Sequence, residues 1–430
     1  METIILLLFV CILLGCVLLD ISILYALLLG YILFAVYSFK KGFSFKEIIR
    51  MSLEGVKTAK NILITFVLIG ILTALWRAGG TIPTIVCYSV KIMQPKLFFV
   101  ITFLLNALVS FLTGTSFGTA ATIGAICVTM GHALELNPIM VGGAMLSGAF
   151  FGDRCSPVST SALLVADLTK TDLYKNIKLM LKTAVVPFLL TCLIYTVYGF
   201  LSPVNGAQML DIHALFAKEF RMNVFTIIPA LLILILALCK IKVKATMLVS
   251  IVVSIIVCMT CQGLSLKEII TFSILGFESA DPALSSMING GGIISMFRVG
   301  AIVCISSSYS GIFHNTGLLN PVTYIIENIG QKLSAYAVTL LTSIATSVIV
   351  CNQTLAIMLT QQLCSHIEKD KQKLAIHIEN SAVIVAPLVP WSIAGSVALA
   401  SAGAPLTSLA ASFYLILIPL WNLFAQHKQA

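Results

Sequence analysis

An acidic side chain inside an apolar segment is the feature of this chain that most directly suggests chemistry. Asp153 lies in the run Gly152-Asp153-Arg154-Cys155-Ser156-Pro157-Val-Ser159-Thr160. A charged side chain is costly inside a membrane, and by default it marks a functional site there. Because Pro157 removes a backbone donor and interrupts a helix, carbonyl oxygens are freed near the carboxylate. Asp153, Ser156, Ser159 and Thr160 therefore form a candidate site.

Carboxylate, hydroxyl and carbonyl oxygens are hard ligands, which suit a hard cation such as sodium by analogy with calcium and magnesium. The carboxylate of Asp153 can also release a proton when the cation arrives, so one site can exchange the two ions. We therefore predict a sodium site at Asp153. The alternative is that Asp153 forms a structural ion pair with the neighbouring Arg154, and the two roles are compatible.

A second acidic residue, Glu379, precedes Asn380 in another apolar segment. Glu379 and Asn380 are therefore further candidates for ion binding. The alternative is that Glu379 lies near the cytoplasmic start of its span, a turn or two beyond Lys373. His377, in the same segment, is expected at the membrane interface.

Two long apolar blocks, 97–130 and 334–365, carry polar residues at their centres. Each block is too long for one span of about 20 residues and too short for two spans with a polar turn. This length predicts a re-entrant hairpin with its tip near the midplane of the membrane. The tips supply further candidate binding residues, with helix–helix hydrogen bonding as the alternative role: Thr115, Ser116, Asn352, Gln353 and Thr354.

The segment after each hairpin is predicted to be a broken helix. Residues 139–168 contain Pro157, and residues 374–404 contain Pro387 and Pro390, followed by Trp391 and Ser392. Broken backbone at membrane depth is tolerated only where it is buried or lines a cavity. Trp391 and Ser392 therefore join the candidate site.

The composition indicates an all-α polytopic membrane protein. The chain has 430 residues, of which 59% are hydrophobic and only 10% charged, against roughly 45–50% and 25% in soluble domains. The net charge of +9 is typical of cytoplasmic Lys and Arg loops, so we expect membrane lipids and no nucleic acid as partners. The twelve cysteines are scattered through apolar segments, so we expect neither disulfides nor a cofactor.

The chain also contains an internal sequence duplication. Ser44-Phe-Lys-Glu-Ile-Ile recurs as Ser265-Leu-Lys-Glu-Ile-Ile, and the two hairpin tips and the two helix breaks align in the same way. Duplication in an apolar chain is typical of secondary transporters with a site between the repeats. We predict repeats over 1–206 and 207–430, each with about five transmembrane helices, a re-entrant hairpin and a broken helix.

An odd number of crossings inverts the second repeat relative to the first. The stretch 40–60 is rich in Lys and Arg, whereas its copy, 265–285, carries Glu268, Glu278 and Asp281. By the positive-inside rule, the first copy is cytoplasmic and the second is outside. Both termini are then cytoplasmic, and residues 170–182 form a basic cytoplasmic loop before a span over 183–201.

These motifs resemble the NhaC-type sodium/proton antiporter family. The resemblance rests on Gly114-Thr-Ser-Phe-Gly-Thr119, Gly148-Ala-Phe-Phe-Gly-Asp153-Arg-Cys-Ser156-Pro157, and Glu379-Asn380 with Pro390-Trp391-Ser392. It implies a fold similar to the hairpin-containing elevator transporters of the ion-transporter superfamily, and coupling of sodium and proton movement through Asp153. It also suggests a possible homodimer.

The leading hypothesis is therefore sodium/proton antiport at the inner membrane of a bacterium. Because members of this family also look like malate and lactate exchangers or amino-acid carriers, the alternative is a sodium- or proton-coupled carrier of a small organic acid or amino acid. A membrane-embedded aspartyl protease would need a second aspartate close to Asp153, and no span supplies one. We therefore expect no enzyme.

Overall fold

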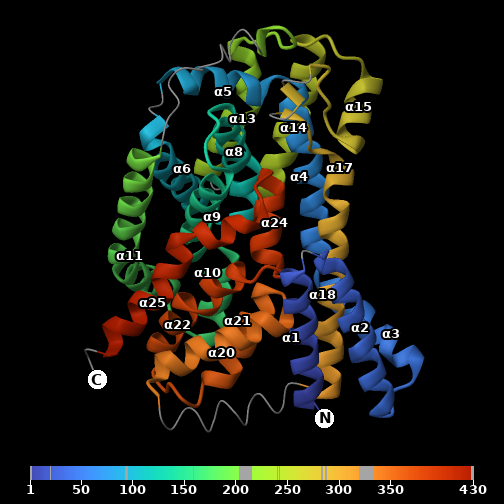
Figure 1. Ribbon diagram of the computed structural model, residues 1–430, viewed down its shortest axis with the longest axis vertical. Helices are drawn as coiled ribbons and strands as arrows, with labels where there is room; N and C mark the ends of the chain where they lie inside the picture. The colour runs from blue at the N-terminus through green and yellow to red at the C-terminus, as the bar shows by residue number, and fades with distance from the viewer. Residues whose placement is uncertain are drawn as a thin grey trace.

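The computed structural model describes residues 2–19, 21–92, 95–157, 159–202, 216–239, 241, 243–281, 284–285, 288–318 and 333–427. Within these ranges the regular elements are helices, and the one β pairing is an isolated bridge between Phe277 and Gly290. The architecture is therefore all-helical, as predicted (Figure 1). The predicted boundary between the repeats, at 206/207, lies outside the described residues.

The helices of the first half run from the N-terminus to residue 201. They are α1 (Glu2–Leu18), α2 (Ile23–Lys40), α3 (Phe45–Thr58), α4 (Lys60–Ala78), α5 (Thr81–Ile92), η1 (Pro95–Leu97), α6 (Phe98–Thr113), α7 (Ser116–Thr119), η2 (Ala120–Gly124), α8 (Ala125–Ala133), α9 (Pro138–Cys155), α10 (Thr160–Thr169) and α11 (Leu173–Leu201).

The second half follows a similar order. Its helices are η3 (Val224–Ile227), α13 (Ile228–Leu238), α14 (Val243–Thr260), α15 (Leu266–Leu275), α17 (Gly292–Ser295), α18 (Phe297–Thr316), α20 (Ala335–Val350), α21 (Gln353–Cys364), α22 (Lys371–Asn380), α23 (Ala382–Val385), η4 (Ala386–Leu388), α24 (Ile393–Ala402), η5 (Leu406–Ala411) and α25 (Phe413–His427).

Few of these helices are long enough to cross a membrane unaided. By length and composition, α11 qualifies alone, and two bent pairs qualify when each is taken as one span. The pairs are Leu63–Ala78 with Thr81–Tyr88, bent by 62°, and Lys371–Leu388 with Ile393–Ala402, bent by 57°. The other apolar helices, including α1, α2, α6, α14, α20 and α25, have 10–17 residues in their apolar parts.

The basic loop predicted for 170–182 is largely helical, and that prediction was wrong. Helix α11 begins at Leu173, where Asp172 accepts a hydrogen bond from the backbone N–H of Lys175 at 2.8 Å. Lysine favours helix, and a capping aspartate fixes the start of one. The basic residues therefore form the first turns of a continuous 29-residue helix.

The two copies of the duplicated motif form helices of the same kind at opposite ends of the molecule. Ser44 and Glu47 form a capping box at the start of α3, and Ser265 and Glu268 form one at the start of α15. In Figure 1, α3 lies toward the lower end, which also carries both termini, whereas α15 lies at the upper end. The duplicated sequence therefore repeats its local structure.

Both predicted hairpin tips interrupt the helix in the same way. Helix α6 is followed by Gly114, with φ of 67°, and α20 is followed by Cys351, with φ of 56°. The next residues, Thr115 and Asn352, are extended and cap α7 and α21 with their side chains. A left-handed residue followed by an N-cap reverses the chain sharply, and α20 and α21 consequently pack against each other.

The approach of α6 to α9 positions the first helix break. A Cβ atom at Gly148 would lie 2.4 Å from the carbonyl oxygen of Phe103, and one at Gly152 would lie 2.2 Å from the backbone nitrogen of Phe111. Small residues allow helix backbones in membranes to touch in this way. The pair holds the end of α9, and with it Asp153, against the helix that leads into the first hairpin tip.

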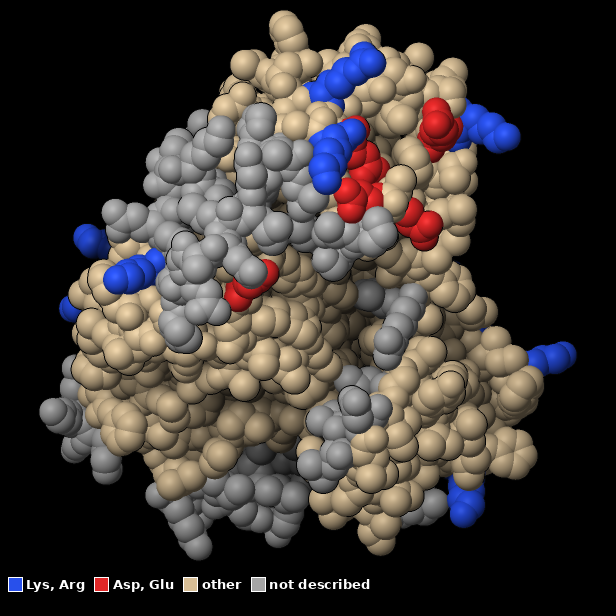
Figure 2. Space-filling model, turned by 45° about the horizontal axis from the view of Figure 1, so that its top comes forward, with Lys and Arg blue, Asp and Glu red and all other residues tan. Residues whose placement is uncertain are grey.

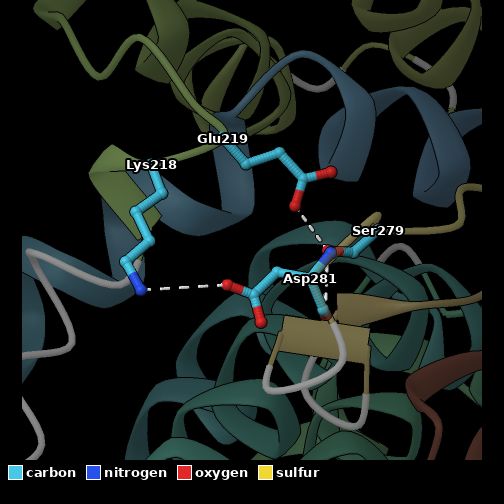
Figure 3. A network of polar contacts seen from close by, with 4 residues as sticks. All are labelled: Lys218, Glu219, Ser279 and Asp281. Carbon is cyan, nitrogen blue, oxygen red and sulfur yellow. Dashed lines mark hydrogen bonds and ion pairs between the residues drawn. The ribbon is translucent and has the colours of Figure 1, made fainter.

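A polar network at the upper end joins the beginning of the second half to the loop after α15. The Nζ atom of Lys218 lies 4.0 Å from a carboxylate oxygen of Asp281, and Glu219 accepts hydrogen bonds from Ser279 Oγ and from the backbone N–H of Ala280 at 3.2 Å (Figure 3). Figure 2 shows acidic side chains gathered near Lys and Arg side chains at this end. Asp281, one of the acidic residues that the sequence places in the second copy, therefore takes part in a tertiary contact.

Candidate functional site

Asp153 lies near the end of α9 with 4% of its surface exposed. Ser159 Oγ donates a hydrogen bond to its Oδ1 atom at 3.3 Å, and Ser161 Oγ donates to its backbone carbonyl at 2.9 Å. The side chain of Gln353, at the second hairpin tip, lies near the carboxylate. The structure therefore brings the first break and the second tip together at Asp153.

The two helix breaks have matching backbone geometry. Ser159, with φ −70° and ψ 136°, caps α10, and Ser392, with φ −73° and ψ 137°, caps α24. Each serine hydroxyl accepts a backbone N–H at the start of its helix. Ser156, in the extended backbone after α9, is also buried. The predicted interruptions are confirmed, and serine is the residue that restarts the helix in both.

Glu379 is fully buried at the end of α22, immediately before a break at Ser381. Within the described part of the chain, neither of its carboxylate oxygens has a hydrogen-bond partner. The carboxylate interacts electrostatically with Asp153 and Arg154. The alternative, that Glu379 lies near the cytoplasmic start of its span, stays a prediction. Helices α10, α11, α20 and α25 cover α22. The same cover buries His377, which was expected at the interface.

Arg154 connects the two halves instead of pairing with Asp153. Its guanidinium is fully buried, and the ion pairs between described residues do not include it. It donates hydrogen bonds to five oxygen acceptors, namely Glu379 O at 3.2 Å, Met180 O at 3.2 Å, Tyr414 Oη at 3.3 Å, Thr183 Oγ1 at 2.9 Å and Asn380 Oδ1. The structural ion pair weighed as an alternative for Asp153 is therefore not formed.

Sequence reasoning missed this connecting role of Arg154. A guanidinium inside an apolar segment was a signal, since its several donors all need acceptors once it is buried. The acceptors on α22, however, lie more than 200 residues away along the chain, and no local pattern identifies them. Through Arg154, Asn380 joins the same cluster as Asp153.

The remaining hairpin-tip residues divide into two groups. Gln353 lies near Asp153, and its Nε2 atom donates to Val383 O at 2.8 Å. The Oδ1 atom of Asn352 instead accepts backbone N–H groups of Thr354 at 2.9 Å and Leu355 at 3.4 Å. Thr115 caps α7 in the same manner, and no contact among the described residues joins it to Asp153. Ser116 is buried, whereas Thr160 and Thr354 are exposed.

Trp391 holds the second break against the second tip. Its Nε1 atom donates to Val348 O at 2.8 Å, and its ring is buried among apolar side chains of α1, α2 and α18. The backbone N–H of Ile393, next to Ser392, donates to Cys351 O at 3.0 Å. These contacts give Trp391 and Ser392 a structural part in the site, because they fix the tip that carries Gln353.

The cluster offers carboxylate and hydroxyl oxygens to a small cation. Among the described residues, no group of three or more His, Cys, Asp or Glu side chains is placed to hold a metal ion. Oxygen donors without thiolates or imidazoles are typical of hard cations rather than of zinc or copper. The donor set around Asp153 is therefore suited to an alkali cation or a proton.

An all-helical apolar chain with two broken helices and buried carboxylates between its halves has the structure of a secondary transporter. The chain belongs to the Na+/H+ antiporter family, whose model matches residues 2–166 and again residues 148–420. It is therefore a membrane protein of a transporter family.

Curated relatives support the same assignment. The chain is 28% identical over 386 residues to the Na(+)/H(+) antiporter NhaC of Alkalihalophilus pseudofirmus. That alignment covers 86% of this chain and 82% of the relative. It is 27% identical over 391 residues to the malate-2H(+)/Na(+)-lactate antiporter of Bacillus subtilis, with 87% and 82% covered. It is 23% identical over 369 residues to the arginine/ornithine antiporter ArcD of Halobacterium salinarum, with 82% and 76% covered.

Proposed function

We propose that this protein exchanges sodium for protons across the cytoplasmic membrane of a bacterium, with Asp153 and Glu379 as the carboxylates that bind the ions. The observation that carries the proposal is that each half supplies a buried carboxylate, and that Arg154, the neighbour of Asp153, hydrogen-bonds to the backbone of Glu379. The Glu379 carboxylate has no hydrogen-bond partner among the described residues. The similarity to relatives named Na(+)/H(+) antiporters supports it.

In the proposed mechanism, sodium and protons compete for the same oxygens. Sodium binds to the Asp153 carboxylate and the Ser159 hydroxyl, and its arrival displaces a proton from the carboxylate. With Asp153 and Glu379 ionised and Arg154 protonated, the three side chains carry a single net negative charge. One sodium ion or one proton neutralises that charge. Binding of either ion therefore disfavours simultaneous binding of the other.

We further infer that the two halves are inverted repeats, with both termini and α3 on the cytoplasmic side. This inference is supported by the positions of α3 and α15 at opposite ends of Figure 1 and by the excess of Lys and Arg around α3. Cysteine labelling at position 45 and at position 266 tests it. Accessibility of both positions from the same side of the membrane would contradict the inversion.

The second candidate function is a sodium- or proton-coupled carrier of a small organic acid or amino acid. Relatives named for malate and lactate and for arginine and ornithine favour it. Uptake of radiolabelled malate, lactate or arginine into proteoliposomes separates the two functions. Sodium-dependent proton flux without uptake of any of these compounds supports the exchanger.

The experiment that tests the main proposal compares three variants in everted membrane vesicles. We expect Asp153→Asn and Glu379→Gln to abolish sodium-dependent proton flux while the proteins remain folded. Asp167→Asn is the matched control, because Asp167 is exposed on α10 and undergoes the same chemical change. Flux like that of the wild type in Asp153→Asn would remove Asp153 from the mechanism.

A further inference from the structure

A cavity with charged residues in its lining opens between α11, α20, α22 and α25. It has a volume of about 590 Å³, and charged side chains line it, namely Lys182, Glu368, Asp370 and Lys373. Because two of these are basic and two are acidic, the lining carries no large net charge. At about 30 Å³ for each water molecule, the cavity has room for several. Helices α20, α22 and α25 lie in the lower part of Figure 1, at the end that carries both termini.

The cavity extends inward along one face of α22. Gln372, Lys373, Ile376 and His377 line it, and this spacing defines a single helical stripe. The next residue on that stripe is Asn380, one turn deeper. His377 is 3% exposed, and its ring packs edge to face against Tyr336 at 5.3 Å. The inner part of the cavity is therefore enclosed by buried side chains.

The floor of the cavity is a polar cluster that also contacts the backbone of Glu379. Thr183 lines the cavity, and its Oγ1 atom accepts from Arg154 Nη2 at 2.9 Å and lies 3.4 Å from Asn380 Oδ1. Arg154 in turn donates to Glu379 O at 3.2 Å. A guanidinium in this cluster places a positive charge beside the floor of the cavity, and that charge opposes passage of cations while the cluster stays intact.

We propose that this cavity is the aqueous vestibule through which cations and protons reach Glu379 and Asp153 from the end of the molecule that carries the termini. The Arg154–Thr183–Asn380 cluster is the closed floor of that vestibule. Arg154 belongs to the first half and Asn380 to the second, so a shift of one half against the other breaks this contact and opens the floor. The inference rests on the proposed ion exchange at the two carboxylates.

The test narrows the vestibule from two walls without touching the floor or the carboxylates. Ala335→Trp adds an indole from α20, and Leu179→Trp adds one from α11. Leu179 is 37% exposed, so its replacement requires no rearrangement of the core. Tyr174→Trp is the matched control, because Tyr174 lies on the same helix as Leu179, is 73% exposed and does not line the cavity.

A narrower route slows the arrival and the departure of an ion equally, so it changes rates and leaves equilibrium binding unaltered. In proteoliposomes we expect both wall variants to reduce the initial rate of sodium-dependent proton flux about tenfold. The sodium concentration that half-saturates thermal stabilisation of the purified protein should stay unchanged. Tyr174→Trp should match the wild type in both measurements.

The possible failures are distinguishable. If both wall variants are folded and retain the flux of the wild type, the vestibule is overturned while ion exchange stands. The same conclusion follows if flux and sodium affinity fall together, since that result indicates damage to the binding site. If the wild type shows no sodium-dependent flux, the proposed function fails first. Should Ala335→Trp fail to fold, Leu179→Trp alone decides the question.

Discussion

Replacement of Arg154 by lysine gives the sharpest test of how the two halves are held together. The guanidinium donates to five oxygen acceptors, two of them on α22. A lysine ammonium keeps the charge but has only three donors, so at least two of these acceptors lose their partner. Hydrogen bonds to a charged group contribute about 1.5–3 kcal/mol each, so the two losses amount to about 3 kcal/mol or more.

We therefore expect Arg154→Lys to lower the free energy of unfolding by about 3 kcal/mol. The measurement is unfolding of the purified protein in mixed micelles, followed by helical circular dichroism. The matched control is Arg50→Lys. Arg50 is exposed on α3 and pairs with Glu54 at 3.2 Å, and such a surface pair contributes about 0.3–0.5 kcal/mol. Equal unfolding curves for the two variants would refute the role assigned to Arg154, because they would show that charge alone is sufficient.

Three further changes are predicted from the packing, the helix breaks and the caps. Gly152→Ala should destabilise the fold by about 1–3 kcal/mol, since its Cβ atom would meet the backbone of α6 at 2.2 Å. Gly15→Ala is the control, because nothing lies within 4 Å of a Cβ atom there. Equal melting temperatures for the two variants would contradict the close packing. Trp391→Phe should lower the free energy of unfolding by about 1–3 kcal/mol because it removes the Nε1–H donor to Val348 O. Trp421→Phe, at a residue 38% exposed, should change the free energy of unfolding by less than about 0.5 kcal/mol. Hydrogen bonds from the backbone N–H and the hydroxyl of Ser44 hold the pKa of Glu47 below its usual range. The stability that Glu47 contributes is therefore fully present above its unfolded pKa of about 4.3. It is lost as the pH falls through the lower pKa of the folded state. Glu47→Gln should remove that acid-dependent part of the unfolding curve, and an unchanged pH dependence would count against the capping box.

The features that were predictable from the sequence are local ones. The interruption after Asp153 follows from proline and serine within a few residues of each other, and the two tips follow from polar residues at the centre of an apolar block. Each of these signals acts through the backbone of its own segment, so no knowledge of distant packing is needed. The same reasoning locates Ser159 beside Asp153, since six residues of broken helix bring them together.

The errors arose where distant packing decides the outcome. Glu379 lies within two turns of Lys373, and nothing in its own segment indicated that helices far away in sequence bury it. The acceptors of Arg154 are likewise supplied by segments far away in sequence. The helical start of α11 is a different case, because Asp172 was a readable cap that the dense run of lysines obscured.

The duplicated scaffold carries chemistry that is not duplicated. In the alignment of the halves, Asp153 corresponds to Ala386 and Glu379 to Leu146, and both of these apolar residues are fully buried in the structure. Two symmetric sites would need a carboxylate at each of the four positions, and burying an acid without compensation is costly. Because each half supplies one carboxylate at a different level of its broken helix, and a single guanidinium contacts both breaks, the arrangement amounts to one shared site. In the exchange mechanism that we propose, a motion between the halves would alter the surroundings of both carboxylates at once, which is the coupling that an exchanger requires.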